Sequence, residues 1–263
     1  MKLLLIHTIC LLGLLVSCAS APSAPTAVRN ELVATGKLRV GLILSNQVLV
    51  SKDSQTGELR GVTIDLGKKL AERMGVPFEA VGYLNPAALV KSFGGNEWDI
   101  AFLAFDPARA QEVNFSPPYM VVDNTYLVPS GSKLLSVAAA DRHDIKIAVP
   151  ERSAPDLFLS RNLKAAQIVR VPGGVDTALE VLRTGRADAY AENAHMLSLY
   201  SERLVGSRVL EGRYTVIQHA IAIQKDRSAA AQYIREFIEQ SKTDGTIQDA
   251  IARANLRRAS VAP

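Results

Sequence analysis

Short apolar strand patterns alternate with helix patterns along the chain, and this alternation restricts the fold more than any other feature. Apolar residues at every second position predict a strand over Lys37–Leu44. Further strands are predicted over Pro77–Tyr83 and Trp98–Ala104, with a helix in each interval. A strand–helix–strand–helix–strand order is typical of a mostly parallel sheet with helices on its faces.

The same pattern recurs in the second half of the chain. Strands are predicted over Asp144–Val149, Gln167–Val171 and Ala187–Ala191, again separated by helices, and a last strand over Thr215–Gln224 precedes two terminal helices. An extended stretch, Tyr119–Pro129, joins the two units. Ligands of open α/β sheets bind at the carboxyl ends of the strands, so two facing units predict a cleft that can close on a ligand.

We therefore predict an α/β fold with two lobes and two crossover strands. Lobe 1 is expected over residues 36–125 and 218–256, and lobe 2 over residues 126–217. Closure would move the lobes about the connecting strands near Asp123–Leu127 and Val216–Ala220. Residues 257–263 are predicted to be a tail.

The N-terminus has the pattern of an export signal. Lys2 precedes the apolar run Leu3–Val16, which is shorter than the roughly 20 residues of a membrane span. We predict a signal peptide over residues 1–17 and a Pro- and Ala-rich tether over 18–35. Leu15–Cys18 resembles the lipobox of bacterial lipoproteins, which implies lipidation of Cys18; the alternative is an ordinary signal end that contains a cysteine. Since both cysteines lie in this leader, no disulfide or cysteine nucleophile is expected in the folded part.

Charge and motif content exclude several classes of function. The 30 basic and 26 acidic residues give a net charge of +4, and no basic run exceeds two residues, so a nucleic-acid partner is not expected. The four histidines lack metal-binding spacing, and phosphate-binding and nucleophile-elbow motifs are absent. We expect no metal and no cofactor.

Arg109 is the strongest candidate for ligand binding from position alone. It follows the strand Trp98–Ala104 closely, and a guanidinium at a strand's carboxyl end can bind a carboxylate through two hydrogen bonds. The alternative is a surface arginine at a helix start, paired with Asp106 or Glu112.

The stretch Asp99–Val121 resembles the central motif of the family 3 extracellular solute-binding proteins, the polar amino-acid receptors of ABC importers. Similar matches follow the family's order at Gly61–Leu66, Gly185–Ala189 and Asp244–Ile247, and the resemblance spans about residues 30 to 256. It implies the type II periplasmic binding fold and a periplasmic receptor, not an enzyme. Such a receptor delivers a small polar solute, an amino acid or related small carboxylate, to an ABC permease; we expect it to be a monomer.

The resemblance also implies roles for individual residues. Arg109 falls on the family's carboxylate-binding arginine, and Ala104 on a position that presents backbone groups to the ligand. Asp106 replaces the family's threonine and could orient Arg109 or meet a cationic part of the ligand. Ser153 matches the hydroxyl residue of a helix-start loop in lobe 2; alternatively it only caps that helix. Arg152, before it, replaces the family's glycine.

Two positions depart further from the family. Asn193 falls on the aspartate that binds the ligand's ammonium, and a neutral amide cannot supply that charge; alternatively Asn193 simply caps a helix. Asn46 lies where the family has an aromatic residue and could offer hydrogen bonds, or be an ordinary turn residue. An enzyme similar to the cyclohexadienyl dehydratases, which use an acidic residue in the same cleft, is the alternative function, with Glu151 or Glu192 in that role.

Overall fold

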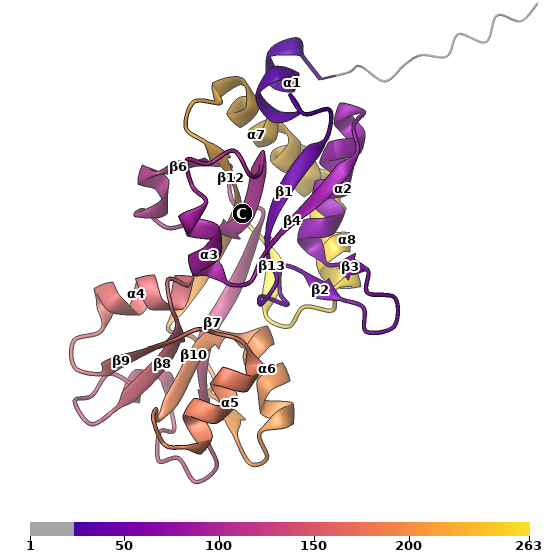
Figure 1. Cartoon of the computed structure of the whole chain (residues 1–263). Helices are drawn as coiled ribbons and strands as arrows, with labels where there is room; N and C mark the ends of the chain where they lie inside the picture. Colours follow the sequence, from indigo (N-terminus) through magenta and orange to yellow (C-terminus); the bar gives the residue numbers. More distant parts are fainter. Residues whose placement is uncertain (1–23) are drawn as a thin grey trace, which may run out of the picture.

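In the computed structural model, which describes residues 24–263, the strands of both predicted units join one eleven-stranded mixed sheet (Figure 1). Its main path runs through eight strands: β4 (Phe78–Tyr83), β1 (Leu38–Ile43), β5 (Ile100–Ala104), β12 (Thr215–Gln224), β7 (Met120–Val128), β10 (Ala189–Asn193), β8 (Lys146–Pro150) and β9 (Gln167–Val171). Short strands β6 (Val113–Phe115), β11 (Arg208–Val209) and β13 (Ala259–Val261) pair beside this path, and β2 (Ser51–Lys52) pairs with β3 (Leu59–Arg60) separately.

The two-lobed architecture predicted from the sequence is confirmed. Strands β4, β1 and β5 are parallel in lobe 1, and β10, β8 and β9 are parallel in lobe 2. Between them, β7 and β12 run antiparallel to each other and connect the lobes, which are the upper and lower halves of Figure 1. The predicted lobe boundaries, after residues 125 and 217, fall inside these two crossover strands.

Helices cover the sheet in each lobe. Those of lobe 1 are α2 (Val62–Met74), α3 (Pro86–Lys91), α7 (Ser228–Thr243) and α8 (Thr246–Arg253). Those of lobe 2 are α4 (Ala154–Asn162), α5 (Val175–Arg183) and α6 (Ala194–Arg203), and single 3-10 turns lie at η1 (Arg109–Gln111) and η2 (Val137–Ala139). Within residues 24–263, no helix combines the length and the apolar character that a membrane crossing requires.

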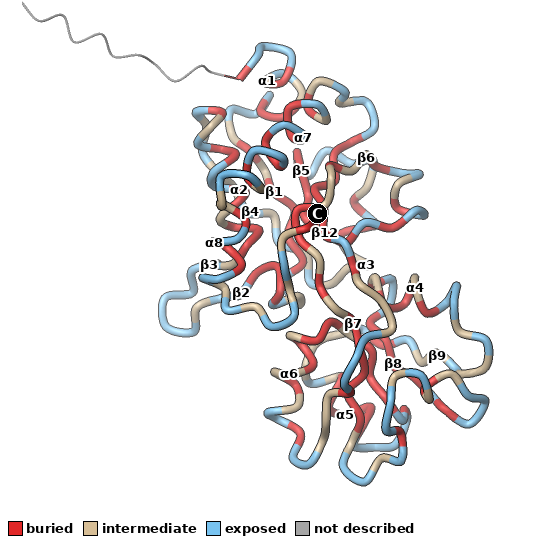
Figure 2. Tube along the Cα trace, turned by 180° about the vertical axis from the view of Figure 1, so that it is seen from behind, coloured by how far each residue is buried: buried red, intermediate tan, exposed pale blue. Residues whose placement is uncertain are grey.

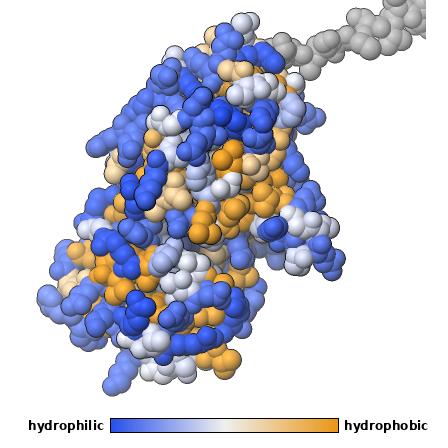
Figure 3. All heavy atoms as spheres, viewed as in Figure 1, coloured by the Kyte–Doolittle hydropathy of each residue, from blue (hydrophilic) through white to orange (hydrophobic). Residues whose placement is uncertain are grey.

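The apolar faces of these elements form the core. In α5, Ala178, Leu179, Val181 and Leu182 are buried in lobe 2. Figure 2 shows buried residues concentrated along the strands and the inward sides of the helices. On the face drawn in Figure 3, hydrophilic residues dominate and apolar residues show in smaller groups. The strands are therefore held rigidly enough to position side chains at their ends.

Two predicted segments are shorter than expected. Part of the tether predicted over 18–35 is the helix α1 (Thr26–Leu32), which packs against α7 because Val28 and Leu32 form an apolar face one turn apart. The predicted tail, 257–263, contains β13, which pairs with β7 and supplies hydrogen bonds to it. Both predictions were wrong there because tertiary packing outweighed local composition. The signal peptide over 1–17 and Cys18 lie outside the described residues.

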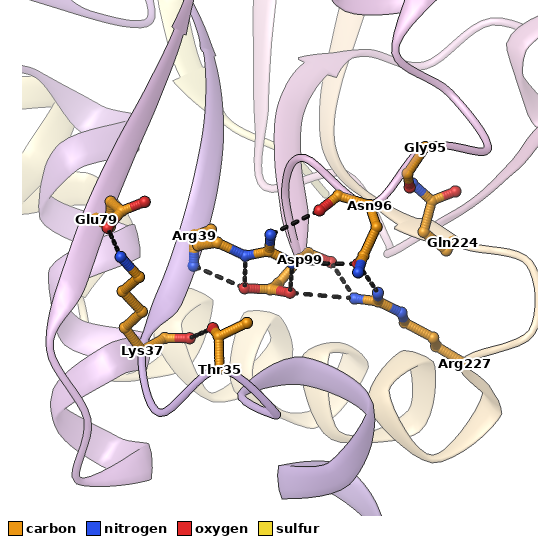
Figure 4. A network of polar contacts seen from close by, with 9 residues as sticks. All are labelled: Thr35, Lys37, Arg39, Glu79, Gly95, Asn96, Asp99, Gln224 and Arg227. Atoms are coloured by element: carbon orange, nitrogen blue, oxygen red, sulfur yellow. Dashed lines mark hydrogen bonds and ion pairs between the residues drawn. The ribbon is translucent and has the colours of Figure 1, made fainter.

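A buried ion-pair network fixes the amino ends of the strands in lobe 1 (Figure 4). Asp99, just before β5, accepts hydrogen bonds from the Arg39 backbone N (2.8 Å) and from its Nη2 (2.8 Å). Arg227, just before α7, reaches the same carboxylate at 3.5 Å. The network thus joins β1, β5 and α7 at the end of β5 opposite to Ala104 and the cleft.

Candidate functional site

A cavity lies between the lobes at the carboxyl ends of the parallel strands. It contains about 580 Å³ of space not filled by atoms, part of which is open to solvent. Ala104 at the end of β5 and Pro150 at the end of β8 both line it, as do Asn124 and His219 of the crossover strands. The position agrees with the cleft predicted from the alternating strands and helices.

Arg109 is buried in the wall of this cavity. Only 4% of its surface is exposed, because η1 turns back immediately after β5. Its Nη1 donates to the Ala104 carbonyl at 2.8 Å, and its Nη2 donates to the Arg152 carbonyl of lobe 2 at 2.6 Å. The Nε–H is buried and has no hydrogen-bond partner among residues 24–263. Of the five guanidinium donors, three therefore remain for a ligand.

The charge of Arg109 persists at physiological pH. Burial lowers the pKa of its guanidinium to about 10, and the nearby carboxylate of Asp106 opposes that change. A cation with unused donors in a partly enclosed cavity attracts an anion strongly, because little water screens it. Of the two sequence interpretations, the surface arginine does not fit a buried residue of this kind.

Asp106 lies beside Arg109 but not in the cavity lining. Its Oδ2 accepts a hydrogen bond from Arg161 Nη2 of lobe 2 at 2.6 Å, and its Oδ1 accepts from the Ala108 N–H at 2.9 Å. The carboxylate is buried, whereas the Arg161 side chain is 47% exposed. Asp106 therefore contributes an ion pair between the two lobes, a contact that the sequence did not predict.

Ser153 and Asn193 each cap a helix and also line the cavity. Ser153 Oγ accepts from the Asp156 N–H at the start of α4, and Asn193 Oδ1 accepts from the Met196 N–H at the start of α6. Each of the two residues therefore caps a helix and faces the cavity at the same time. The amino end of α4 therefore borders the cavity, and the amino end of a helix favours an anion.

Asn46 and Ala104 complete the set of predicted site residues in the cavity wall. Asn46 Oδ1 accepts from the Val48 N–H at 3.2 Å, so it stabilises a turn after β1 as well as lining the cavity. The Ala104 carbonyl is already bonded to Arg109 and orients its guanidinium. The structure thus places Asn46, Ala104, Arg109, Ser153 and Asn193 around one space.

Three polar residues of the cavity were missed or underrated in the sequence. Asn124 of β7 and His219 of β12 are 1% and 4% exposed, and in the described part of the chain Asn124 Oδ1 and His219 Nδ1 have no hydrogen-bond partner. Burial, together with the charge of Arg109, lowers the pKa of His219 to about 3, so its ring is neutral. Each lies beside other polar residues of its strand, Asp123 and Thr125 in β7 and Gln218 in β12, so the sequence carries no distinct signal for either.

Glu192 is the third of these residues. It lines the cavity at the end of β10, where its Oε1 accepts from the Asn193 backbone N–H (2.8 Å) and Nδ2 (2.9 Å). Burial raises the pKa of its carboxyl group to about 7. Across residues 24–263, the structure brings no three histidine, cysteine or acidic side chains together in a way that could hold a metal ion.

Comparison with known proteins gives consistent matches. The family described as bacterial extracellular solute-binding proteins, family 3, matches residues 38–254. The ABC transporter glutamine-binding protein GlnH of Bacillus subtilis (strain 168) is 22% identical over 214 residues, which cover 80% of this chain and 77% of that protein.

Solved structures share the fold. A mutant of ArgBP from T. maritima has a TM-score of 0.74 at 22% identity and covers 87% of this chain and 99% of its own. An ancestral amino acid-binding protein, AncCDT-1, described as a precursor of cyclohexadienyl dehydratase, has a TM-score of 0.72 at 25% identity, over 85% of this chain and 97% of its own. These likenesses extend over both lobes.

Proposed function

Because the chain belongs to the bacterial extracellular solute-binding proteins, family 3, we propose that it captures a small polar solute, an amino acid or a related small carboxylate, and delivers it to an ABC permease. The observation that carries the proposal is Arg109, a buried cation with an unpartnered Nε–H in a cavity shared by two lobes. The chain acts as a receptor and changes no bond in the solute.

The geometry explains how the cleft would bind a carboxylate. The three spare donors of Arg109 match the two oxygens of a carboxylate, and Ser153 at the amino end of α4 adds a hydroxyl and a favourable helix dipole. Ala104 holds the guanidinium from lobe 1 and Arg152 holds it from lobe 2. A ligand that contacts both lobes therefore favours the closed arrangement over an open one.

Contacts across the cleft support closure as part of the mechanism. The Arg109–Arg152 hydrogen bond and the Asp106–Arg161 ion pair both link lobe 1 to lobe 2. Only the crossover strands β7 and β12 need to bend for these contacts to break, because each lobe keeps its own parallel strands. The closed form would present a defined surface to the permease.

We also propose that the receptor works as a monomer outside the cytoplasmic membrane, tethered there by lipid at Cys18. The proposal follows from the leader and its lipobox. Expression in a bacterial host with radiolabelled palmitate tests it: label should enter the wild-type protein, and Cys18→Ala should abolish the label and release the protein from the membrane fraction.

Calorimetry tests the receptor function. A thermal-shift screen of amino acids and organic acids identifies binders, since a ligand of the folded form raises the melting temperature. Arg109→Ala should then weaken the tightest binder at least tenfold. Arg186→Ala, an exposed arginine after α5, is the matched control and should leave affinity unchanged. If Arg109→Ala binds the solute as tightly as the wild type does, Arg109 does not bind the ligand's carboxylate.

A dehydratase is the second candidate, and Glu192 is the observation that favours it. A partly buried carboxyl group with a pKa of about 7, in the same cavity as Arg109, is suited to hold and donate a proton near neutral pH. Incubation with prephenate or arogenate separates the two functions. A receptor gives no product, whereas turnover that Glu192→Gln abolishes would establish the enzyme.

A further inference from the structure

The chain after α8 runs from lobe 1 to the edge of lobe 2 and back. We call residues 255–261 the C-terminal strap. The strap follows α8, which packs on α2 and α7 of lobe 1, and it ends with β13, which pairs with residues 120–122 at the lobe 1 end of β7 (Figure 1). Since residues 254–258 alone separate α8 from β13, both ends of the strap are fixed to lobe 1.

The middle of the strap contacts lobe 2. The backbone N–H of Arg257 donates to His195 Nδ1 on α6 at 3.2 Å, and Arg257 Nη1 lies 3.4 Å from Glu202 Oε1 near the other end of the same helix. The Nη2 of Arg258 donates to the carbonyl of Gly212, in the loop before β12, at 2.6 Å. A segment that is anchored in lobe 1 therefore makes three contacts with lobe 2.

Arg258 also holds the crossover strand β7. Its Nε donates to Asp123 Oδ2 at 3.1 Å, and its carbonyl accepts from the Asp123 backbone N–H at 3.0 Å. Arg213, from the loop before β12, donates to the other carboxylate oxygen, Oδ1, at 2.9 Å. Asp123 lies near the point where β7 passes from one lobe to the other. The strand that has to bend during closure is therefore bound by one arginine from the strap and one from lobe 2.

The backbone of Arg258 is strained. Its φ of 56° lies in the left-handed region, which residues with a side chain rarely adopt. Such a conformation persists where the surrounding contacts enforce it. For Arg258 these contacts are the ones with Asp123 and Gly212, so the strain is tied to the connection between the lobes.

We propose that Arg258 is a positioning residue: through the strap it holds lobe 2 in the closed arrangement from outside the cleft, and so raises the affinity for the solute. The strap contacts occur together with the hydrogen bond and the ion pair that link the lobes across the cleft. Because both ends of the strap are fixed to lobe 1, rotation of lobe 2 about β7 and β12 would stretch the strap's contacts with lobe 2. Contacts that are made in one of two arrangements favour that arrangement.

The strap acts on every ligand alike. Residues 255–261, all within the described part of the chain, do not line the cavity. When a fraction of the ligand-free protein is closed, the apparent dissociation constant is the intrinsic one divided by that fraction. A weakened strap therefore weakens all ligands that contact both lobes by one common factor. This effect on affinity rests on the proposed receptor function, whereas the effect on the shape of the ligand-free protein does not.

Small-angle X-ray scattering of the ligand-free protein tests the arrangement of the lobes. Arg258→Gln removes the ion pair with Asp123 and should enlarge the radius of gyration. His195→Ala removes an acceptor on lobe 2 without altering the strap, and should change the radius in the same direction. Arg253→Gln is the matched control: it breaks an ion pair of 2.7 Å between α8 and Asp65 of α2, within lobe 1, and should leave the radius unchanged.

Calorimetry with each standard amino acid tests the effect on affinity. Arg258→Gln should weaken every amino acid that the wild type binds by the same factor, about threefold or more. Arg253→Gln should bind each of them as the wild type does. Urea unfolding of each variant establishes that the proteins compared are folded, and if Arg258→Gln does not fold, His195→Ala decides the outcome.

Two results would overturn the role of the strap. One is an unchanged radius of gyration in both Arg258→Gln and His195→Ala. The other is a loss of affinity that differs from one amino acid to another, because it would indicate a distorted cleft and not a shifted balance between the arrangements. If the radius increases in both variants but the wild type binds no amino acid, the role of the strap is supported and the receptor function fails.

Discussion

Replacement of Glu192 by glutamine should make the ligand-free protein more stable above neutral pH. Burial raises the pKa of this carboxyl from the ordinary value of 4.5 to about 7, so the folded protein holds the proton more tightly than the unfolded chain does. The stabilising contribution of the proton is complete below pH 4.5 and is lost as the pH rises through 7. At 1.36 kcal/mol per pH unit, the loss amounts to about 3 kcal/mol.

Urea unfolding followed by circular dichroism measures this effect. The free energy of unfolding is compared for the wild type and Glu192→Gln at pH 4 and pH 8, after bound solute has been removed by unfolding and dialysis. All other titrating groups are shared, so the difference between the two proteins isolates Glu192. We expect that difference to move by about 3 kcal/mol in favour of the variant between pH 4 and pH 8.

Glu151→Gln, the exposed control, should show no such trend. If the difference between Glu192→Gln and the wild type is the same at pH 4 and pH 8, the carboxyl is not held in a low-dielectric cavity. Desolvation of Glu192 at the end of β10 would then not raise its pKa in the folded protein.

Three further predictions concern other parts of the molecule. His219→Gln should reduce the loss of stability in acid, measured by urea unfolding, because the lowered pKa of His219 makes the wild type lose stability as the pH falls below 6.5. Arg161→Gln removes the ion pair with Asp106 and should enlarge the ligand-free radius of gyration in small-angle X-ray scattering and weaken solute binding severalfold. Asp99→Asn leaves the two partly buried arginines Arg39 and Arg227 without a counter-charge and should destabilise the fold by about 3 kcal/mol in urea, with unchanged solute affinity.

The order of helices and strands was predictable from the sequence because the apolar residues recur with clear helix and strand periods. Gln167–Val171 and Thr215–Gln224 have the predicted bounds, since turn residues and alternating apolar positions mark their ends. The joining of both lobes into one sheet could not be read from periodicity. It depends on the pairing of β7 with β12, two strands about 90 residues apart in the chain.

Local composition was a poor guide at the two ends of the folded part. The Pro- and Ala-rich segment predicted a tether, yet Val28 and Leu32 bury an apolar face on α7. Residues 259–261 are too short to show a strand pattern, and they become β13 only because the edge of β7 offers backbone groups to pair with. Both outcomes depend on a distant surface that local patterns do not reveal.

A residue of the cleft was predictable from the sequence when it follows the end of a strand. A residue inside a strand was not. Arg109 comes soon after β5, so its place at the cavity follows from the general rule for α/β sheets. Asn124 and His219 lie in the crossover strands, and only the pairing of β7 with β12 brings them to the same cavity. The raised pKa of Glu192 depends on its burial among several elements, which no single motif encodes.

A crystal structure of the protein with its tightest-binding amino acid tests the central claim most directly. The account predicts the ligand carboxylate within hydrogen-bond distance of the Arg109 guanidinium, with further contacts from lobe 2. A guanidinium that points into solvent, or a ligand bound by one lobe only, would contradict it.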